Sequence, residues 1–255
     1  MKKAKTTIQV LLISAAICFI APETKAVTFD DGGTHNIDYT INDNVTVMAE
    51  ETFWEKEETT MNLLSGGLIG NSVRAYDNSQ IHIFGGSVRY DLYAYEGCYV
   101  DISGGSIADR LETTDNSQAY ISGGSIDGWL KTSGYSHVSI SDGTVAGELH
   151  AEQNSQVDVS GGTLGHEVYS EGNSRVNISG GLETGNPLHA WDSSVFTIYG
   201  SYPVSYGWGG ACYDESNLKM VFRGRYRLFL QVYQGQTSKQ WLHQAFLFSM
   251  YARQS

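Results

Sequence analysis

The sequence predicts an all-β fold, a right-handed parallel β-helix (solenoid) with 19-residue coils. The main observation is a Gly-Gly pair that returns every 19 residues, with Asp-Gly in the same place in one copy. A unit of this length is too short to bury its own apolar side chains, so successive units must stack on one another. The copies begin at Gly66, Gly85, Gly104, Gly123, Asp142, Gly161 and Gly180.

Within each copy, apolar and polar residues alternate over short segments, which is typical of strands with one buried face. Counted from the first residue of the pair, positions 4, 8, 10, 16 and 18 are mostly apolar or small, as in Val157-Asp158-Val159. Because equivalent positions of stacked coils lie about 4.8 Å apart, we expect interior columns of Val, Ile and Leu. Cys98 is expected to be a buried free thiol, since Cys212 lies far along the stack. It joins a predicted hydroxyl column at position 14, with Ser79, Ser117, Ser136, Ser155 and Ser174.

Turn residues separate the predicted strands. Positions 12–14 hold triplets such as Asp77-Asn78-Ser79, in which Asn and Gly tolerate the left-handed backbone of a sharp corner. The Gly-Gly pair supplies a second corner. Other repeat folds do not fit, because leucine-rich repeats need a denser leucine pattern, calcium-binding rolls need Gly-Gly-x-Gly-x-Asp, and hexapeptide helices repeat in sixes. The crossover rule for parallel strands then favours a right-handed coil.

Two stretches resemble a known family. Ser122–Ile126 and Asn173–Gly181 are similar to the repeats of secreted bacterial right-handed β-helix proteins of the pectate-lyase-like superfamily. The resemblance covers roughly residues 32–200 and implies a fold but no particular activity. Many such proteins end in a Pro-Glu-Pro sorting signal, which this sequence does not contain. Polysaccharide lyases of the superfamily cluster calcium-binding aspartates beside a basic catalytic residue, and no such cluster maps onto this sequence.

Residues 1–26 are typical of a secretory signal peptide. A lysine-rich start precedes a mostly apolar stretch, Ile8–Ala21, and Thr24-Lys25-Ala26 offers small residues at a cleavage site. The apolar stretch is shorter than the roughly 20 residues of a spanning helix, although an uncleaved membrane anchor is the alternative. We expect a mature chain from near Val27, without a transmembrane segment, secreted or at the surface of a bacterial cell.

Negative charge is concentrated in the repeat region. Residues 27–200 contain 6 Lys and Arg against 25 Asp and Glu, a formal net charge of −19, whereas residues 201–255 carry +4. Nucleic acid is therefore not an expected partner, because phosphate contacts need a basic face. The acidic body is compatible with cation binding, so calcium is a candidate ligand, although no cofactor is otherwise indicated.

The sequence divides into four segments. The insertion Ala49–Met61 is rich in glutamate and is either a projecting interaction loop or a cap with a solvated acidic rim. Past Gly200 the period is lost, and a strand around Arg223–Leu228 and a short helix from Ser238 are expected, unless this tail has no evolved fold. The segments are 1–26 (signal peptide), 27–65 (N-terminal coil and cap with acidic insertion), 66–200 (β-helix repeats) and 201–255 (C-terminal cap or poorly ordered tail).

Outward positions 7 and 9 form ladders on one face and hold the candidate catalytic residues. Glu148 and Glu167 take equivalent places on adjacent coils, about 4.8 Å apart between backbones, with His150 and Tyr169 beside them. Paired carboxylates near that separation can serve a retaining glycosidase or hold a calcium ion. An acidic repeat also brings carboxylates together without function, so we expect no catalysis and keep Glu148, Glu167 and His150 as the candidates.

Aromatic side chains supply the candidate ligand-binding residues. An exposed ring offers a sugar a flat apolar face with a polar tip. Tyrosine is also a good strand former on wet sheet faces, so these rings have a purely structural interpretation as well. The candidates are Tyr93, Tyr120, Trp129 and Tyr169.

The sequence holds no convincing catalytic signature. We therefore expect a secreted, non-enzymatic β-helix with a surface-associated structural or adhesion role. Its expected partners are extracellular polysaccharide or cell-surface components. The alternative is a polysaccharide lyase or glycoside hydrolase that acts on the outward acidic face.

Overall fold

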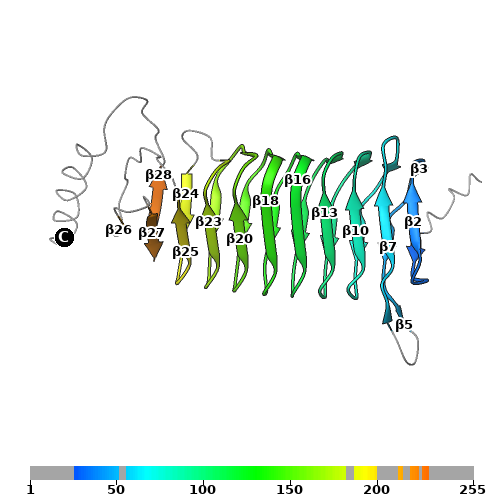
Figure 1. Cartoon of the computed structure of the whole chain (residues 1–255), viewed down its shortest axis with the longest axis horizontal. Helices are drawn as coiled ribbons and strands as arrows, with labels where there is room; N and C mark the ends of the chain where they lie inside the picture. The colour runs from blue at the N-terminus through cyan, green and yellow to red at the C-terminus, as the bar shows by residue number, and fades with distance from the viewer. Residues whose placement is uncertain are drawn as a thin grey trace, which may run out of the picture.

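The computed structural model is a parallel β-solenoid of about 8 coils, seen from the side in Figure 1. The structure describes residues 26–51, 56–181 and 187–199, together with three short strands between 212 and 229. Within these residues every regular element is a strand, and strands of successive coils pair in parallel about 19 residues apart. The predicted all-β solenoid with 19-residue coils is confirmed.

One sheet, sheet A, is formed by positions 8–10, which precede the corner at positions 12–14, and runs the length of the rod. Each of its strands contributes two inward side chains and one outward side chain in the regular coils. In spatial order its strands are β1 (Val27–Phe29), β4 (Val45–Val47), β9 (Val73–Ala75), β12 (Leu92–Ala94), β15 (Leu111–Thr113), β17 (Leu130–Thr132), β19 (Leu149–Ala151), β22 (Val168–Ser170), β24 (Pro187–Ala190) and β28 (Tyr226–Phe229).

The other long sheet, sheet B, contains the longest strands. In spatial order these are β2 (Thr34–Ile37), β7 (Thr60–Leu63), β10 (Gln80–Ile83), β13 (Tyr99–Ile102), β16 (Gln118–Ile126), β18 (His137–Val145), β20 (Gln156–Val159), β23 (Arg175–Ile178), β25 (Val195–Ile198), β27 (Lys219–Arg223) and β26 (Cys212–Asp214). A row of short strands after the Gly-Gly corner joins it through β16 and β18. The row consists of β3 (Thr40–Ile41), β8 (Leu68–Ile69), β11 (Ser87–Val88), β14 (Ser106–Ile107) and β21 (Thr163–Leu164).

The coils stack with each residue directly above its equivalent. Gln80 pairs with Tyr99, and the step of 19 residues continues as far as Arg175. The step lengthens to 20 at both ends, from Thr60 to Gln80 and from Arg175 to Val195. This register keeps every inward position inward, because a slip of one residue would turn a strand over.

The inward positions fill the rod with columns of apolar side chains, as the sequence predicts. In β12, Leu92 and Ala94 are fully buried, while Tyr93 between them is partly exposed. The same alternation occurs in β10 and β13 of sheet B. Full burial of a Leu or Ile side chain contributes roughly 1.5–3 kcal/mol relative to exposure. These columns therefore provide the main stabilising contribution.

The predicted hydroxyl column at position 14 is also present. Cys98 occupies one place in it as a free, buried thiol, with Sγ 3.4 Å from Ser79 Oγ, and burial raises the pKa of this thiol. Five of the serine hydroxyls bond to carbonyls of the preceding coil, as Ser174 Oγ does to Ala151 O at 2.9 Å, whereas the buried Ser117 Oγ has no hydrogen-bond partner among the described residues. They thereby satisfy carbonyl groups at a buried corner. The buried column consists of Thr59, Ser79, Cys98, Ser117, Ser136, Ser155, Ser174 and Ser194.

The corner at positions 12–14 differs in part from the prediction. We expected Asn or Gly in the left-handed conformation, but it falls mainly on position 12, where Asp, Glu and Gln also occur. The φ angle is 57° at Asp77, 60° at Asp115 and 61° at Gln153. Short polar side chains such as Asp can bond locally and so tolerate this conformation. The prediction was right about the place and incomplete about the residue types.

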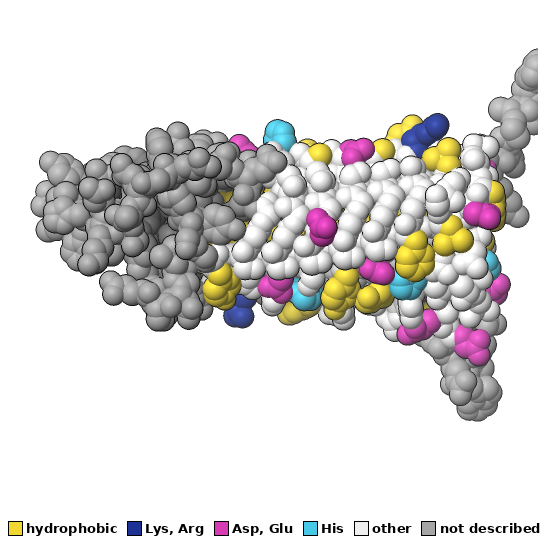
Figure 2. All heavy atoms as spheres, turned by 45° about the horizontal axis from the view of Figure 1, so that its top comes forward, with side chains coloured by type: hydrophobic (Ala, Val, Ile, Leu, Met, Phe, Trp, Pro, Cys, Tyr) yellow, Lys and Arg dark blue, Asp and Glu magenta, His cyan; other side chains and the backbone are white. Residues whose placement is uncertain are grey.

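The Gly-Gly corner packs backbone against backbone. The second residue of the pair takes positive φ, as at Gly124 (73°), except in the first copy, where the positive φ falls on Gly66 (91°). A Cβ on Gly124 would meet the carbonyl oxygens of Gly104 at 2.7 Å and Gly105 at 2.8 Å. Figure 2, which brings the top of Figure 1 forward, shows this side of the rod as diagonal rungs of backbone and small side chains. The close approach therefore requires glycine.

Both ends of the rod depart from the parallel pattern. Between β4 and β7, β5 (Glu50–Glu51) and β6 (Lys56–Glu57) pair antiparallel and project as a separate hairpin (Figure 1). This hairpin lies in the acidic insertion, whose residues 52–55 are outside the described part. At the other end, β27 pairs antiparallel with β25, and β28 with β24, so the strand edges of the last coil are covered.

Some expectations concern residues beyond the described part of the chain. The predicted signal peptide lies outside it except for Ala26, and the predicted helix from Ser238 lies wholly outside it. Where we expected one strand around Arg223–Leu228, the structure has β27 ending at Arg223 and β28 beginning at Tyr226.

Replacing Gly124 with alanine should destabilise the protein. The new Cβ meets two carbonyl oxygens and the residue must keep its positive φ, which costs about 1–3 kcal/mol for a non-glycine residue. The measurement is the urea unfolding midpoint of Gly124→Ala. Gly33→Ala is the matched control, because its Cβ meets only the flexible side chain of Asp31. Equal midpoints for the two variants would contradict the close packing of this corner.

Candidate functional site

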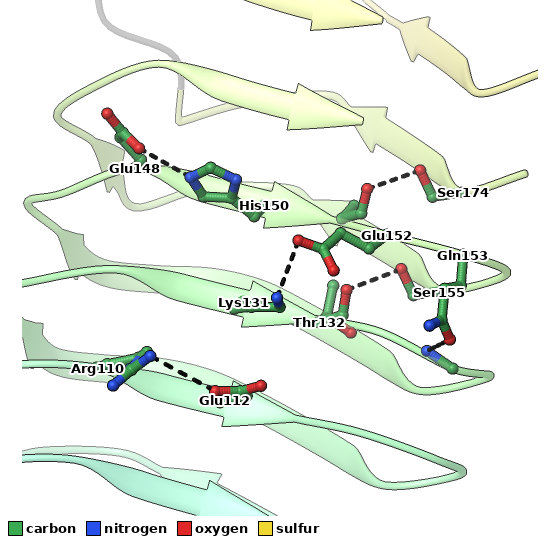
Figure 3. Close-up of polar contacts among 12 residues, drawn as sticks. Arg110, Glu112, Lys131, Thr132, Glu148, His150, Glu152, Gln153, Ser155 and Ser174 are labelled. Carbon is green, nitrogen blue, oxygen red and sulfur yellow. Dashed lines mark hydrogen bonds and ion pairs between the residues drawn. The ribbon is translucent and has the colours of Figure 1, made fainter. Parts of the chain in front are cut away.

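The candidate catalytic residues lie together on the outer face of sheet A. Glu148 immediately precedes β19 and His150 is its central residue, and Figure 3 shows both on this coil. Glu167 and Tyr169 take the same places at β22, where Tyr169 pairs in register with His150. The structure thus brings these four predicted residues together on adjacent coils.

Aromatic rings stack from coil to coil along this face. The ring centroids of His150 and Tyr169 are 4.5 Å apart with 13° between the planes, and those of Tyr169 and His189 are 4.6 Å apart at 11°. Trp191 lies 5.5 Å from His189 at one end. Trp129 lies 5.6 Å from His150 at the other end, tilted by 35°. We call these five residues the ring stack.

Two carboxylates hold the rings of this stack. Glu148 Oε2 lies 2.8 Å from His150 Nε2, and Glu167 Oε2 lies 3.0 Å from His189 Nε2. The Tyr169 hydroxyl donates a hydrogen bond to the same Glu167 oxygen. His189 is buried, so its contact with Glu167 lies inside the stack. Both carboxylates therefore orient rings, a structural role that the sequence analysis did not assign.

The sequence analysis missed His189 and Trp191. Their coil is one residue longer than the regular coils, so Tyr169 pairs with His189 at a step of 20. Counting in steps of 19 from Tyr169 would reach Leu188, and the outward ladders of the sequence prediction ended at Glu167 and Tyr169. The signal that could have found them is the triplet Leu188-His189-Ala190, which repeats the apolar, outward, small order of Val168-Tyr169-Ser170.

Trp129 lies at the corner that precedes sheet A, and its side chain is 51% exposed. Gly147 on the next coil gives it room, since a Cβ there would meet Trp129 Cδ1 at 3.0 Å. Tyr90, which is 48% exposed, lies at the same corner two coils earlier. Backbone hydrogen bonds connect these coils, from Gly128 to Asp109 and from Asp109 to Tyr90. We call the surface formed by Tyr90, Asp109, Asp127, Trp129 and Glu148 the Trp129 corner.

Tyr93 also lies on sheet A, but both faces of its ring have partners. The guanidinium carbons of Arg74 and Arg110, on the neighbouring coils, each lie 5.5 Å from the ring centroid. The Tyr93 hydroxyl donates to Asp91 Oδ2 at 2.8 Å, and burial together with this carboxylate raises the pKa of Tyr93 above 10.0. A ligand would therefore meet the edge of this ring rather than its face.

Tyr120 lies on sheet B, apart from the other three candidate rings. Its centroid is 5.3 Å from that of Tyr99, and it meets His137 edge-on at 6.5 Å. Sheet B faces the viewer in Figure 1 and turns toward the lower margin in Figure 2, where hydrophobic, histidine and acidic side chains form a row. The four predicted ligand-binding residues therefore do not form one surface.

His137 belongs to a hydrogen-bonded group around Asp158. His137 Nε2 lies 2.6 Å from Asp158 Oδ2. Gln156 Nε2 and Asn177 Nδ2 each donate to the same carboxylate at 2.7 Å. Burial by itself raises the pKa of Asp158, but the hydrogen bonds outweigh it and hold this pKa below 3.8. The fold therefore stabilises the charged form of this residue.

In comparisons with known proteins, no family model, no curated protein and no solved structure matches this chain. Among the described residues, no three or more His, Cys, Asp or Glu side chains are grouped so as to hold a metal ion. No helix in that same part of the chain is long and apolar enough to cross a membrane. The protein is thus a parallel β-solenoid whose outer face carries rings and carboxylates.

Asp158→Asn should lower the stability of the folded protein at neutral pH. It should also reduce the loss of stability that occurs when the solution is acidified. A carboxylate whose pKa is lowered by folding stabilises the folded state above its unfolded pKa. This stabilisation is lost as the pH falls through the folded value, which here lies below 3.8. The measurement is the urea unfolding midpoint at neutral pH and at a pH below the folded-state pKa of Asp158. Asp38→Asn, at an exposed position, is the control. A midpoint of Asp158→Asn that falls on acidification as steeply as that of the unsubstituted protein would contradict the prediction.

Proposed function

We propose that this protein is a secreted, non-enzymatic β-solenoid that binds polysaccharide through the Trp129 corner and has a surface-associated structural or adhesion role. The observation that carries the proposal is the half-exposed indole of Trp129, held on a rigid coil beside carboxylates. The signal-like residues 1–26 support a location outside the cytoplasm. The resemblance of the repeats to secreted bacterial β-helix proteins supports the same location.

The chemistry of the corner suits a sugar. A sugar ring has an apolar face of C–H groups and a rim of hydroxyl groups. The indole can pack against the apolar face, and carboxylates accept hydrogen bonds from the hydroxyls. Trp129 already rests against Gly147 and contacts the His150 ring, so little side-chain freedom is lost on binding.

The other candidate rings suit this role less well. Histidine rings lie on both sides of Tyr169, with centroids at 4.5 and 4.6 Å. Tyr93 lies between two guanidinium groups, and Tyr120 is tilted against Tyr99 on the other sheet. Trp129 has the most exposed side chain of the four predicted ligand-binding residues. It is therefore the residue on which we base the proposal.

Tyr90 extends the same surface along the rod. It lies two coils before Trp129, about 10 Å away between backbones. A polymer that runs parallel to the rod axis can therefore contact both rings. The rigid backbone between them keeps this spacing constant, because each coil is hydrogen-bonded to the next.

Trp129→Ala should reduce retention of the mature protein on insoluble cellulose, chitin or cross-linked polyuronate, whichever it binds. Loss of an aromatic stacking contact is expected to weaken binding about tenfold. The measurement is a pull-down isotherm for each polymer. Tyr135→Ala is the matched control, because Tyr135 is 72% exposed at a different corner. Unchanged retention of Trp129→Ala, or an equal loss in Tyr135→Ala, would remove the basis of the proposal.

A second measurement distinguishes the proposed binding function from the alternative, a polysaccharide lyase or glycoside hydrolase. The mature protein is incubated with uronate-rich and neutral glycans, with and without calcium. We expect no release of unsaturated or reducing ends, because Glu148 and Glu167 are already engaged with the ring stack. Release that disappears in the Glu148→Gln, Glu167→Gln double variant would replace the binding function with an enzymatic one.

A further inference from the structure

Three acidic residues lie close to Trp129 along the backbone of its own coil and of the two adjacent coils. Asp109 and Asp127 are exposed, and Glu148 is half-buried. The backbone places Asp109 and Glu148 on the neighbouring coils, since Gly128 N donates to Asp109 O and Leu130 N donates to Glu148 O, both at 2.9 Å. Asp127 precedes Trp129 by two residues. Acidic residues of three successive coils therefore lie next to Trp129 along the rod axis.

Two cations of the coils that carry this surface, Arg110 and Lys131, have acidic partners, whereas Arg89, next to Tyr90, is exposed. Arg110 Nε lies 3.4 Å from Asp91 Oδ1, and Arg110 Nη1 lies 3.8 Å from Glu112 Oε2. Lys131 Nζ lies 3.0 Å from Glu152 Oε1. Figure 3 shows the contacts of Arg110 with Glu112 and of Lys131 with Glu152 on these coils. Around Trp129 itself the acidic residues Asp109, Asp127 and Glu148 therefore outnumber the cations that these contacts leave available, and Arg89 adds a positive charge only at the Tyr90 end of the surface.

From this charge distribution we infer that the Trp129 corner binds a glycan whose sugars carry free, protonated amino groups. The inference rests on the proposed function and names its ligand class. An ammonium group beside an indole gains a cation–π interaction, and each carboxylate offers it a charge-assisted hydrogen bond. A uronate polymer would instead bring like charges together at every sugar, which opposes binding.

A basic peptide fits this surface less well. Side chains on one side of an extended peptide recur about every 6.7 Å, whereas the coils that carry the acidic residues recur about every 4.8 Å. A flexible peptide also loses more conformational freedom when it binds a rigid rod. An amino sugar presents a flat C–H face and a cation within one rigid ring, which matches an indole flanked by carboxylates.

The test compares soluble glucosamine oligomers with the N-acetylated oligomers of the same length, by titration calorimetry at a pH where the amines are protonated. The amine form should bind about fivefold tighter for each exposed charge contact, and high salt should remove this difference. Asp109→Asn with Asp127→Asn should lose most of the preference. Asp30→Asn with Asp38→Asn is the matched control, because it removes the same charge from exposed positions on the first coil and should keep the preference.

The outcomes separate this inference from the proposed function. Equal affinity for the two oligomers would overturn the inference. An equal loss of the preference for the amine form in both double variants would also overturn it, because the attraction would then depend on net charge alone. Oligolysine that binds as tightly with the same dependence on Trp129 would overturn it in favour of a peptide ligand. Trp129→Ala that binds every oligomer like the unsubstituted protein would instead overturn the proposed function itself. Absence of binding to either oligomer would overturn the inference, whereas the proposed function would be overturned only if the protein also bound none of the insoluble polymers.

Discussion

Parallel pairing in register between successive coils is the constraint on which the rest of this structure depends. Because each coil sits directly on the previous one, a residue type suited to one place in the coil is suited to that place in all of them. The buried hydroxyl column shows this, since a thiol can replace a hydroxyl at Cys98 without disturbing the stack. The Gly-Gly corner shows it as well, since a Cβ on the positive-φ glycine would meet two carbonyl oxygens of the preceding coil at both Gly105 and Gly124.

The same register builds the outer face, although it constrains that face less. Side chains that point outward need to suit only their neighbours on adjacent coils, so the chemistry changes along the rod while the backbone does not. In the middle of sheet A the outward ladder is ionic, with Arg110 beside Glu112 and Lys131 beside Glu152 (Figure 3). Toward the C-terminal end it becomes aromatic, because His150 and Tyr169 face each other at 4.5 Å.

Much of the fold and part of the candidate site could be predicted from the sequence, because a repeat shows both the length of the coil and the positions that point inward. The coil length, the buried columns and the adjacency of Glu148, His150, Glu167 and Tyr169 follow from counting in steps of 19. Counting in steps of 19 fails where the period changes. His189 was therefore not predicted as an outward residue, because it follows Tyr169 by 20 residues. It also says nothing about the orientation of rings, and so it could not show that Tyr93 lies between two guanidinium groups.

Stacking and ligand binding compete for the same ring faces, and this competition decides where on a solenoid a binding surface can lie. A ring inside a stack is stabilised by neighbours on both sides and offers a ligand only its edge, as Tyr169 does between two histidines. An open face is available where the aromatic column ends. Trp129 is that end, because the preceding coil carries Arg110 at the equivalent position and the following coil carries Gly147 beneath the indole. The His150 ring contacts Trp129 from one side at a tilt of 35°, and the residue remains about half exposed, so the stack supports the indole without covering it.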